Sequence, residues 1–442
     1  MIIKRSIEHK LLDWKNNPDR KPLILQGVRQ VGKTWLLKYF GTHHFEGIAY
    51  FNFERQTELK QFFKNTKEPK RILQNLSLAS GKPILPGKTF IIFDEIQECN
   101  EALNSLKYFA EEAPEYVIAC AGSLLGVAIS RGASFPVGKV DFIQLYPLSF
   151  REFLAKADEA LYTYIESIDE IKLIPDTFFN PLTEKLKMYF ISGGMPEAAV
   201  KLLNHQDVGL TEETLTNILN AYRLDFSKHI ENKDIPKINY IWNSLPSQLA
   251  RENNKFFYQS IKSGARAREY ENALQWLINA GLVYRIYRSV KPSLPLSAYD
   301  DLSAFKIYLP DVGLLRSLSQ LNPIAITEGN RLFTEFKGAL TENYIVNSLI
   351  HQFGTPARYW KSENKAEVDF ILQSENDIIP IEVKSSENIR SKSLSVFRKQ
   401  YNPKLSLRYS MKNFKYDNGL LNIPLFMADY TSKFIKKIQF AK

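Results

Sequence analysis

Eight consecutive residues near the N-terminus have the spacing of a phosphate-binding loop. They fit the pattern G-x-x-x-x-G-K-[ST], whose backbone N–H groups surround phosphate oxygens: Gly27, Val28, Arg29, Gln30, Val31, Gly32, Lys33 and Thr34. The apolar run 22–26 predicts a buried strand before the loop, and 35–40 predicts a helix that Gly41 ends. We therefore expect Lys33 to reach the β- and γ-phosphates of ATP and the Thr34 hydroxyl to bind Mg²⁺, with Trp35 completing the nucleotide-binding stretch.

A second apolar run ends in two carboxylates. Residues 89–93 lead directly into Asp94 and Glu95. A parallel strand buried on both faces is typically an unbroken apolar run, and ligands of such sheets bind outside the carboxyl ends of the strands. We therefore expect Asp94 to lie beside the loop and hold Mg²⁺ through water, and Glu95 to polarise the attacking water as a general base. The alternative is that both are solvated residues at a strand end.

Three further polar residues could take part in the same chemistry. Ser123 follows the apolar run 116–121, and its hydroxyl could hydrogen-bond the γ-phosphate or the water; an ordinary strand-end serine is the alternative. Arg131 and Lys139 precede a fifth predicted strand at 140–145. A cation there could stabilise charge on the transferred phosphoryl group, from the same chain or from a neighbouring subunit, as an arginine finger does. A surface cation without a catalytic role is the alternative.

Composition bounds the kind of protein. The 442 residues allow two to four domains, and 44% hydrophobic and 24% charged residues are typical of globular chains. Residues 331–442 hold 18 Lys+Arg and 11 Asp+Glu, so 18 − 11 = +7 of the net +10 lies there. This excess favours a polyanionic partner such as DNA, with an ordinary solvated basic surface as the alternative. The chain has two cysteines, Cys99 and Cys120, which exclude a disulfide framework. The sequence contains no apolar run like a membrane-spanning helix or a signal peptide, so we expect a cytoplasmic protein that does not bind membranes.

The elements that must position these residues divide into four predicted domains. Residues 1–155 are predicted to form an α/β core, in which a parallel sheet holds the loop and the strand-end acids. Residues 156–235 read as helices and are predicted to form a lid on that core. Residues 236–320 are predicted to form a winged-helix-like module, and residues 321–442 a C-terminal α/β domain.

The third predicted domain contains helices followed by two strands, at 282–287 and 305–309. This order is consistent with a winged helix-turn-helix. Lys262, Arg266 and Arg268 would then open its recognition helix, where contacts to DNA are made. Because many winged-helix units mediate only protein contacts, a protein-binding module is the alternative.

Four residues of the fourth domain follow the order of the PD-(D/E)xK metal nucleases. Glu342 lies on a predicted helix at 335–352 and Asp369 on a strand, and alternation puts Glu382 and Lys384 on one face of the next strand. Asp369 and Glu382 would bind Mg²⁺, Lys384 would activate water, and Glu342 would support the metal from its outer shell. The alternative is a site that has lost its activity and whose polar groups satisfy one another.

Nearly the whole chain resembles a known family. It is similar to the bacterial and archaeal AAA+ ATPases that join a P-loop core to a C-terminal restriction-endonuclease-like domain of unassigned role. The residues that carry the resemblance are 27–34, 93–95, 122–123, 145–153, 193–197, 308–314, 342, 367–370 and 382–384. The resemblance implies ATP binding and an AAA+ α/β core. Members usually have Gly-Arg where this chain has Gly138-Lys139, and lysine lacks the bidentate fork of arginine.

These observations lead to one expectation and two alternatives. We expect an AAA+ ATPase that binds ATP and Mg²⁺ and whose nucleotide state repositions the C-terminal modules, with nucleic acid as the partner. The first alternative is a nucleotide-gated, metal-dependent DNA nuclease. The second is a non-enzymatic switch in which ATP holds one conformation for a protein partner. The sequence leaves the oligomeric state open.

Overall fold

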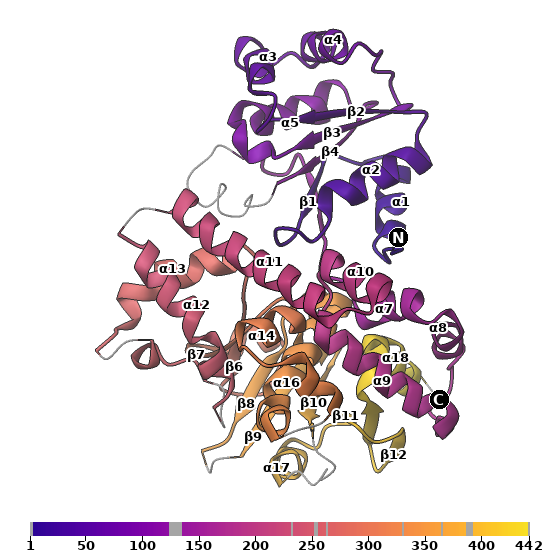
Figure 1. Cartoon of the computed structure of the whole chain (residues 1–442), viewed down its shortest axis with the longest axis vertical. Coiled ribbons are helices and arrows are strands. Elements are labelled where there is room, and N and C mark those ends of the chain that lie inside the picture. Colours follow the sequence, from indigo (N-terminus) through magenta and orange to yellow (C-terminus); the bar gives the residue numbers. More distant parts are fainter. Residues whose placement is uncertain are drawn as a thin grey trace. The chain divides into compact units, whose positions relative to one another are not determined.

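A computed structural model of the chain describes residues 3–122, 135–230, 233–251, 255–261, 264–328, 331–363, 366–385 and 392–440. These residues form an α/β protein that divides into two units (Figure 1). The first unit comprises residues 4–146 together with 279–282, and the second comprises the remaining residues. No helix within the described ranges is long and apolar enough to cross a membrane.

The first unit contains a parallel sheet whose described strands have the order β2-β3-β4-β1-β5. The strands are β1 (Leu23–Gln26), β2 (Gly47–Asn52), β3 (Thr89–Asp94), β4 (Val117–Ala121) and β5 (Asp141–Gln144). Nearly all side chains of β1, β3 and β4 are buried, as their unbroken apolar runs predicted. Because all five strands run in one direction, the loop after β1 leaves the sheet at the same edge as the ends of β2 and β3.

Helices cover both faces of this sheet. On one face, the ring of Phe90 packs against Trp14 and Phe40, which belong to α1 (Glu8–Asn16) and α2 (Lys33–His44). The other face carries Phe51 and Phe93 and forms the larger apolar core. It is covered by η1 (Thr57–Leu59), α3 (Lys60–Asn65), α4 (Pro69–Ser80), η2 (Ile96–Glu98) and α5 (Asn100–Glu112).

One local prediction in this unit is wrong. Gly41 does not end the helix after the loop, because α2 continues to His44. A Cβ atom at Gly41 would lie 2.9 Å from side-chain atoms of Ile48 and Phe90. This glycine therefore allows α2 to approach the sheet closely, which is a packing role that helix-ending statistics do not include.

The second unit combines helices with a sheet. The helices in the first half of its sequence are α7 (Phe150–Ala157), α8 (Glu159–Glu166), α9 (Asp176–Ser192), α10 (Pro196–His205), α11 (Val208–His229), α12 (Ile235–Leu249), η3 (Tyr258–Ser260) and α13 (Ala267–Asn279). The helices in the second half are η4 (Leu296–Tyr299), α14 (Val312–Leu318), α15 (Pro323–Glu328), α16 (Arg331–Phe353), α17 (Lys392–Tyr401), η5 (Leu425–Tyr430) and α18 (Thr431–Phe440).

The sheet of the second unit has the described strand order β12-β13-β11-β10-β9-β8-β6-β7. In this sheet β9 and β10 form an antiparallel hairpin, whereas β10, β11 and β13 run parallel. The strands are β6 (Tyr284–Ser289), β7 (Asp300–Tyr308), β8 (Arg358–Lys361), β9 (Glu367–Ser374), β10 (Asp377–Val383), β11 (Ser406–Ser410), β12 (Lys415–Asp417) and β13 (Leu420–Pro424).

The strands predicted as a separate wing belong to this larger sheet. They are β6 and β7, and β6 pairs in parallel with β8, with Arg288 opposite Tyr359 and Ser289 opposite Trp360. The predicted domain boundary at residue 320 therefore falls between strands of one sheet. The sequence pattern did not reveal this pairing because three helices, α14, α15 and α16, separate β7 from β8 along the chain.

Candidate functional site

The loop after β1 has glycine at two positions that a side chain would disturb. A Cβ atom at Gly27 would lie 2.4 Å from the carbonyl oxygen of Leu145. Gly32 has a φ of 94°, in the left-handed region, directly before α2. The predicted order of strand, glycine loop and helix is therefore present, and a helix N-terminus after such a loop is an established setting for phosphate groups.

Lys33 is buried at the start of α2, with 7% of its surface exposed. Its Nζ donates hydrogen bonds to the carbonyl oxygens of Gly27, at 2.7 Å, and Val28, at 3.1 Å. Burial lowers the pKa of Lys33 from 10.5 to about 8, although the negative charges of Glu95 and Asp94 oppose this shift. These two hydrogen bonds are to neutral groups, so an anion in the loop would strongly stabilise the lysine charge.

Asp94 lies at the end of β3 and accepts hydrogen bonds from three side chains. The Thr34 hydroxyl lies 3.0 and 3.1 Å from its two carboxylate oxygens. The Tyr50 hydroxyl donates to Oδ2 at 2.7 Å, and Asn52 Nδ2 donates to the same oxygen at 3.3 Å. Burial and the hydrogen bond to Asp94 raise the pKa of Tyr50 to about 12, which keeps its hydroxyl a proton donor.

The sequence predicted that Asp94 lies beside the loop residue Thr34, as it does here, but it did not predict the contacts of Tyr50 and Asn52. A usable signal existed, because both are polar residues near the end of an apolar strand. In the sheet β2 lies beside β3, with Asn52 directly opposite Asp94. The chain also holds the loop through Arg5, whose guanidinium donates to the carbonyl oxygens of Val31 and Tyr146 at 3.3 and 2.6 Å.

Glu95 follows Asp94 in an unusual backbone conformation. Its φ of 49° is in the left-handed region, which is uncommon for a residue other than glycine and recurs at functional sites. Gln97 Nε2 donates to Glu95 Oε2 at 2.6 Å and fixes the carboxylate after the end of β3. Ser123 and Arg131, which were also predicted for this site, lie outside the described residues.

Lys139 lies at the opposite edge of the sheet. Asp141, the first residue of β5, is opposite Leu23, the first residue of β1, so residues before β5 lie where the strands begin. The side chain of Lys139 forms an ion pair with Glu111 at 2.7 Å. A four-residue parallel strand spans about 13 Å. The predicted role of Lys139 at the loop of its own chain is therefore wrong, and only a neighbouring copy could be its target.

The residues at the loop fit a magnesium ion. Mg²⁺ prefers oxygen ligands and usually takes one or two carboxylates together with waters and substrate phosphates. The Thr34 hydroxyl and the Asp94 carboxylate supply such oxygens within hydrogen-bonding distance of each other. Lys33 supplies a cation next to them for the phosphate groups.

The four predicted nuclease residues belong to α16 and the β9–β10 hairpin. The register that pairs Phe370 with Ile381 brings Asp369 opposite Glu382. Lys384 Nζ lies 2.6 Å from Glu382 Oε1. Burial, with the nearby charges of Glu382 and Glu342, raises the pKa of Asp369 well above its usual value.

A buried lysine that the sequence analysis did not consider compensates part of the charge of this acid cluster. Lys306, on β7, is 1% exposed, and its Nζ lies 2.7 Å from Glu367 Oε1. Burial would lower its pKa, but the carboxylates of Glu342, Glu367 and Asp369 outweigh burial and raise the pKa above its ordinary value. Lys306 therefore supplies inside the cluster part of the positive charge that a metal ion would bring.

Two lysines pair with carboxylates of the acid cluster, where a metal ion was predicted. Within the part of the chain that the structure describes, no group of three or more His, Cys, Asp or Glu residues is arranged to hold one. Lys306 and Lys384 pair with the carboxylates of Glu367 and Glu382, whereas Glu382 Oε2 is buried and has no hydrogen-bond partner among the described residues. The predicted magnesium site at Asp369 and Glu382, with Glu342 behind it and Lys384 beside it, therefore stays a prediction.

The residues predicted to contact DNA are only partly described. Arg266 and Arg268 lie at the start of α13 with exposed side chains, and Lys262 lies outside the described residues. A DNA contact and an ordinary solvated surface both require exposure, so these positions favour neither alternative.

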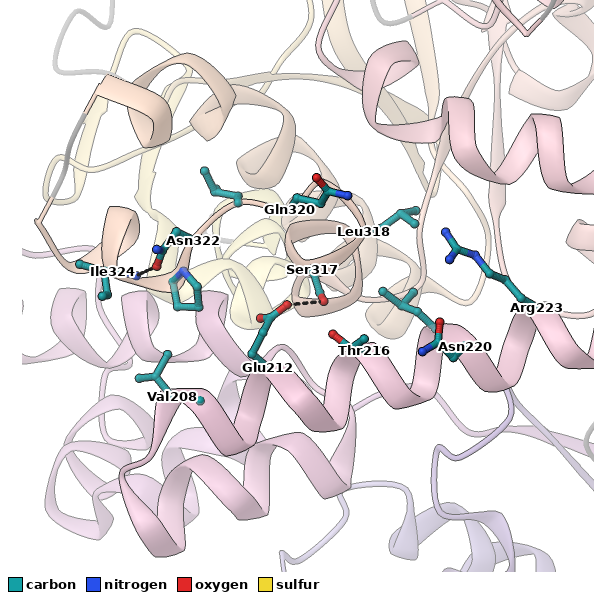
Figure 2. Close-up of a pocket in the computed structure, with 14 residues that line it drawn as sticks. Val208, Glu212, Thr216, Asn220, Arg223, Ser317, Leu318, Gln320, Asn322 and Ile324 are labelled. Atoms are coloured by element: carbon teal, nitrogen blue, oxygen red, sulfur yellow. Dashed lines mark hydrogen bonds between the residues drawn. The ribbon is translucent and has the colours of Figure 1, made fainter.

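A cavity of about 680 Å³ lies between α11 and the segment that joins α14 to α15 (Figure 2). Its acid, Glu212, accepts a hydrogen bond from Ser317 at 2.7 Å and pairs with the buried Arg316. The cavity contains neither predicted site. Its other polar lining residues are Thr216, Asn220, Arg223, Gln320 and Asn322.

Three segments of the chain match protein families. Residues 19–154 match a family described as AAA domain. Residues 183–325 and 337–426 match two families described as domains of unknown function, DUF8612 and DUF4143. None of the curated proteins matches the chain.

Solved structures similar to this chain include ATPases and DNA-bound proteins. A Walker-type ATPase of Pyrococcus abyssi is 16% identical, with 72% of this chain and 96% of that chain covered and a TM-score of 0.47. The Aeropyrum pernix ORC1 protein in complex with DNA is 13% identical, with 74% and 94% covered and a TM-score of 0.25. Drosophila ORC bound to DNA is 11% identical, with 72% and 94% covered and a TM-score of 0.27. These TM-scores are too low to carry an argument about this chain.

The AAA match coincides with the sheet, the loop and the strand-end acids of the first unit. Residues 19–154 are therefore similar to an AAA domain, and the prediction of an α/β core with a parallel sheet is confirmed. The restriction-endonuclease-like character of the C-terminal domain stays a prediction.

Proposed function

We propose that the first unit hydrolyses ATP with the help of Mg²⁺. The observation that carries the proposal is the contact between Thr34 and Asp94 next to the buried Lys33. A hydroxyl and a carboxylate that share a hydrogen bond at the edge of a parallel sheet are oxygen ligands ready for a hydrated cation. The Lys33 cation, held by carbonyl groups, is ready to exchange them for phosphate oxygens.

Each side chain then has a defined task. Lys33 binds the β- and γ-phosphate oxygens, and Thr34 and Asp94 would hold Mg²⁺, which neutralises phosphate charge when bound. Tyr50 keeps the Asp94 carboxylate in one orientation. Glu95 orients a water molecule and accepts its proton while the water oxygen bonds to the γ-phosphorus and the bond to the bridging oxygen of ADP breaks.

Steady-state turnover of ATP tests this proposal. We expect Glu95→Gln to lower kcat by roughly 10²- to 10⁴-fold, because the amide cannot accept the proton, while ATP still binds. Glu98→Gln, which changes the next acid along the chain, is the matched control and should turn over normally. If the wild-type protein binds ATP and shows no turnover, the ATPase proposal is refuted and the non-enzymatic switch is favoured. If Glu95→Gln hydrolyses ATP at the wild-type rate, catalysis by Glu95 is refuted.

We further propose that the nucleotide state alters the second unit and that nucleic acid is its partner. The support is the excess of +7 in residues 331–442. Binding of a labelled DNA duplex, measured at several salt concentrations, should weaken with a log–log slope of about 0.9 for each phosphate contact. The affinity should differ between ADP and a non-hydrolysable ATP analogue. A DNA affinity that does not change with salt argues against a nucleic-acid partner. Equal DNA affinities with ADP and with the ATP analogue argue against coupling between the nucleotide state and the second unit.

The nuclease alternative is the weaker proposal, because Lys306 pairs with Glu367 and compensates part of the charge that a metal ion would neutralise. DNA cleavage with Mg²⁺ or Mn²⁺ that disappears in Lys384→Ala would support it. We expect no such cleavage.

A further inference from the structure

A smaller cavity in the second unit, of about 370 Å³, gathers positive charge. It lies between α17, the two residues that follow this helix, and the strands β11 and β13. Three of its lining residues are cations, Arg398, Lys399 and Arg408, and among the described residues no acid lines it. The other lining residues are Leu394, Ser395, Asn402, Pro403 and Leu420. A cavity with three cations and no carboxylate in its wall is suited to an anion.

A buried amide fixes the orientation of Arg408. Asn422, which is 1% exposed, lies opposite Arg408 in the β11–β13 pair. Its Oδ1 accepts hydrogen bonds from Arg408 Nε at 2.9 Å and from Ser410 Oγ at 2.8 Å. Its Nδ2 donates to the carbonyl oxygens of Lys412, at 3.1 Å, and Asn413, at 2.9 Å. The amide is fully engaged, so it holds the guanidinium in one plane, and an oriented guanidinium can bind two phosphate oxygens at once.

Simpler explanations cover only part of this charge. Arg398 and Lys399 lie in the last turn of α17, where cations stabilise the negative end of the helix dipole. That explanation does not include Arg408, which lies on a strand. Glu382 lies opposite Arg408 on β10, and its carboxylate, which pairs with Lys384 at 2.6 Å, also favours the charged form of Arg408. This acid is therefore shared between two cations, and it does not line the cavity.

The size and the remaining lining indicate which anion fits. The cavity is large enough for a phosphate together with a sugar, whereas a phosphate alone would fill only a small part of it. Ser395 and Asn402 can hydrogen-bond sugar oxygens, and Leu394 and Leu420 offer apolar contact. The wall contains no aromatic ring on which a base could stack. Recognition would therefore act through the phosphate and the sugar.

We propose that this cavity binds a nucleoside phosphate unit, either as a free nucleotide or as one unit of a nucleic-acid strand. In its strand form the proposal rests on the nucleic-acid partner proposed above and specifies where one phosphate is held. It does not depend on ATP hydrolysis by the first unit.

Two probes and matched variants of the full chain test the proposal. The probes are a fluorescent short single-stranded oligonucleotide and thymidine monophosphate, both without added ATP. Arg408→Gln should weaken binding roughly ten-fold and lower the salt slope for the oligonucleotide by about 0.7, the contribution of one single-strand phosphate. Lys399→Gln should weaken binding to a smaller extent. Lys404→Gln is the control, because Lys404 is 81% exposed, pairs with Asp377 and does not line the cavity.

Each outcome has a defined meaning. Weaker binding of both probes supports the site for either source, and weaker binding of one probe alone supports the site for that source. Equal losses in Lys404→Gln and Arg408→Gln, or unchanged binding in both Arg408→Gln and Lys399→Gln, overturn the proposal. Arg408→Lys keeps the charge but loses the fork, so it replaces Arg408→Gln if thermal unfolding shows that the glutamine variant is not folded. A protein that fails to hydrolyse ATP but binds the oligonucleotide through Arg408 would refute only the ATPase proposal.

Discussion

Two buried lysines show that the two units treat charge differently. Lys33 is 7% exposed and Lys306 is 1% exposed, and carboxylates lie near both. Burial lowers the pKa of Lys33 to about 8, whereas for Lys306 the neighbouring carboxylates overcome burial and raise the pKa above its ordinary value. The difference follows from the bonded partners. The lysine of the first unit binds the carbonyl oxygens of Gly27 and Val28, and the lysine of the second binds the carboxylate of Glu367.

This comparison separates a lysine that is available to bind an anion from a lysine that is already paired with a carboxylate. A buried cation bonded to carbonyl groups retains part of its desolvation cost and is stabilised when an anion arrives. A buried cation bonded to a carboxylate has already gained that stabilisation, and removing either partner leaves the other uncompensated. Strand-end acids near a lysine therefore do not by themselves identify a catalytic site. The bonded partner of the lysine is the more informative observation.

The largest expected effect is on stability when Lys306 is removed. Lys306→Met should lower the free energy of unfolding by about 3–5 kcal/mol, because Glu367 and its neighbours lose their buried counter-charge. Lys306→Met/Glu367→Gln should recover part of this loss. The control is Lys361→Met, since Lys361 is 3.6 Å from Glu367 but 34% exposed, and it should cost less than about 1 kcal/mol. Urea unfolding followed by circular dichroism measures all three; equal losses in the two single variants would break the comparison.

The opposite sign is expected for Lys33. Without ATP, Lys33→Met should raise the free energy of unfolding by about 1–3 kcal/mol, because a desolvated charge without a bonded carboxylate is removed. The same variant should lose the stabilisation that ATP and Mg²⁺ give the wild-type protein, about 2.7 kcal/mol at one hundred times the Kd. Lys88→Met, an exposed lysine of the same unit, should change neither quantity. A less stable Lys33→Met protein without ATP would show that Lys33 is already neutralised.

The pH dependence of ATP binding gives a third test. The folded pKa of Lys33, about 8, lies below its ordinary value of 10.5, so the folded protein without ATP releases this proton first as pH rises. The unfolded chain then binds more protons between these two values, and stability without ATP should rise across this interval. Affinity for ATP should fall about ten-fold per pH unit above pH 8, because the neutral amine no longer attracts phosphate. Titration calorimetry measures the affinity for ATP at each pH. The affinity of Lys33→Arg, whose side chain stays charged, should not decline above pH 8.

The sequence predicted the P-loop sheet well because its signals are local. Unbroken apolar runs identified β1, β3 and β4, and the spacing of the loop identified Gly27, Lys33 and Thr34. Because ligands of such sheets bind at the carboxyl ends of the strands, Asp94 could be predicted to lie near Thr34 without knowledge of the strand order. Lys139 was misassigned because the same rule was not applied to it: it precedes β5, and the parallel pairing of β1 and β5 puts it where the strands begin.

The second unit was predicted less well because its contacts join distant parts of the chain. Lys306 lies within the apolar stretch 305–309, where alternation puts it on the face opposite Phe305 and Ile307 and so suggests that it is exposed. Residues 304–308 are instead all buried, and Glu367 from another strand is the partner of Lys306. Glu342, Asp369 and Glu382 follow the order of a linear motif, and this motif has no position for a lysine from another strand. A buried countercharge from a distant strand is invisible to a linear motif.

The smallest expected effect concerns the hydrogen bonds that orient Asp94 beside the loop of the first unit. Tyr50→Phe removes one of the hydrogen bonds to Asp94 Oδ2 and leaves those from Thr34 and Asn52. The Mg²⁺ concentration for half-maximal turnover should rise about 2- to 10-fold, the worth of one hydrogen bond. At saturating Mg²⁺ the KM for ATP should stay unchanged, because Lys33 and the loop still bind the phosphates. Tyr116→Phe, a partly buried tyrosine packed against the larger core of the first unit, serves as the control and should leave the Mg²⁺ dependence unaltered. A Tyr50→Phe protein with wild-type Mg²⁺ dependence would mean that Thr34 and Asn52 alone orient the carboxylate.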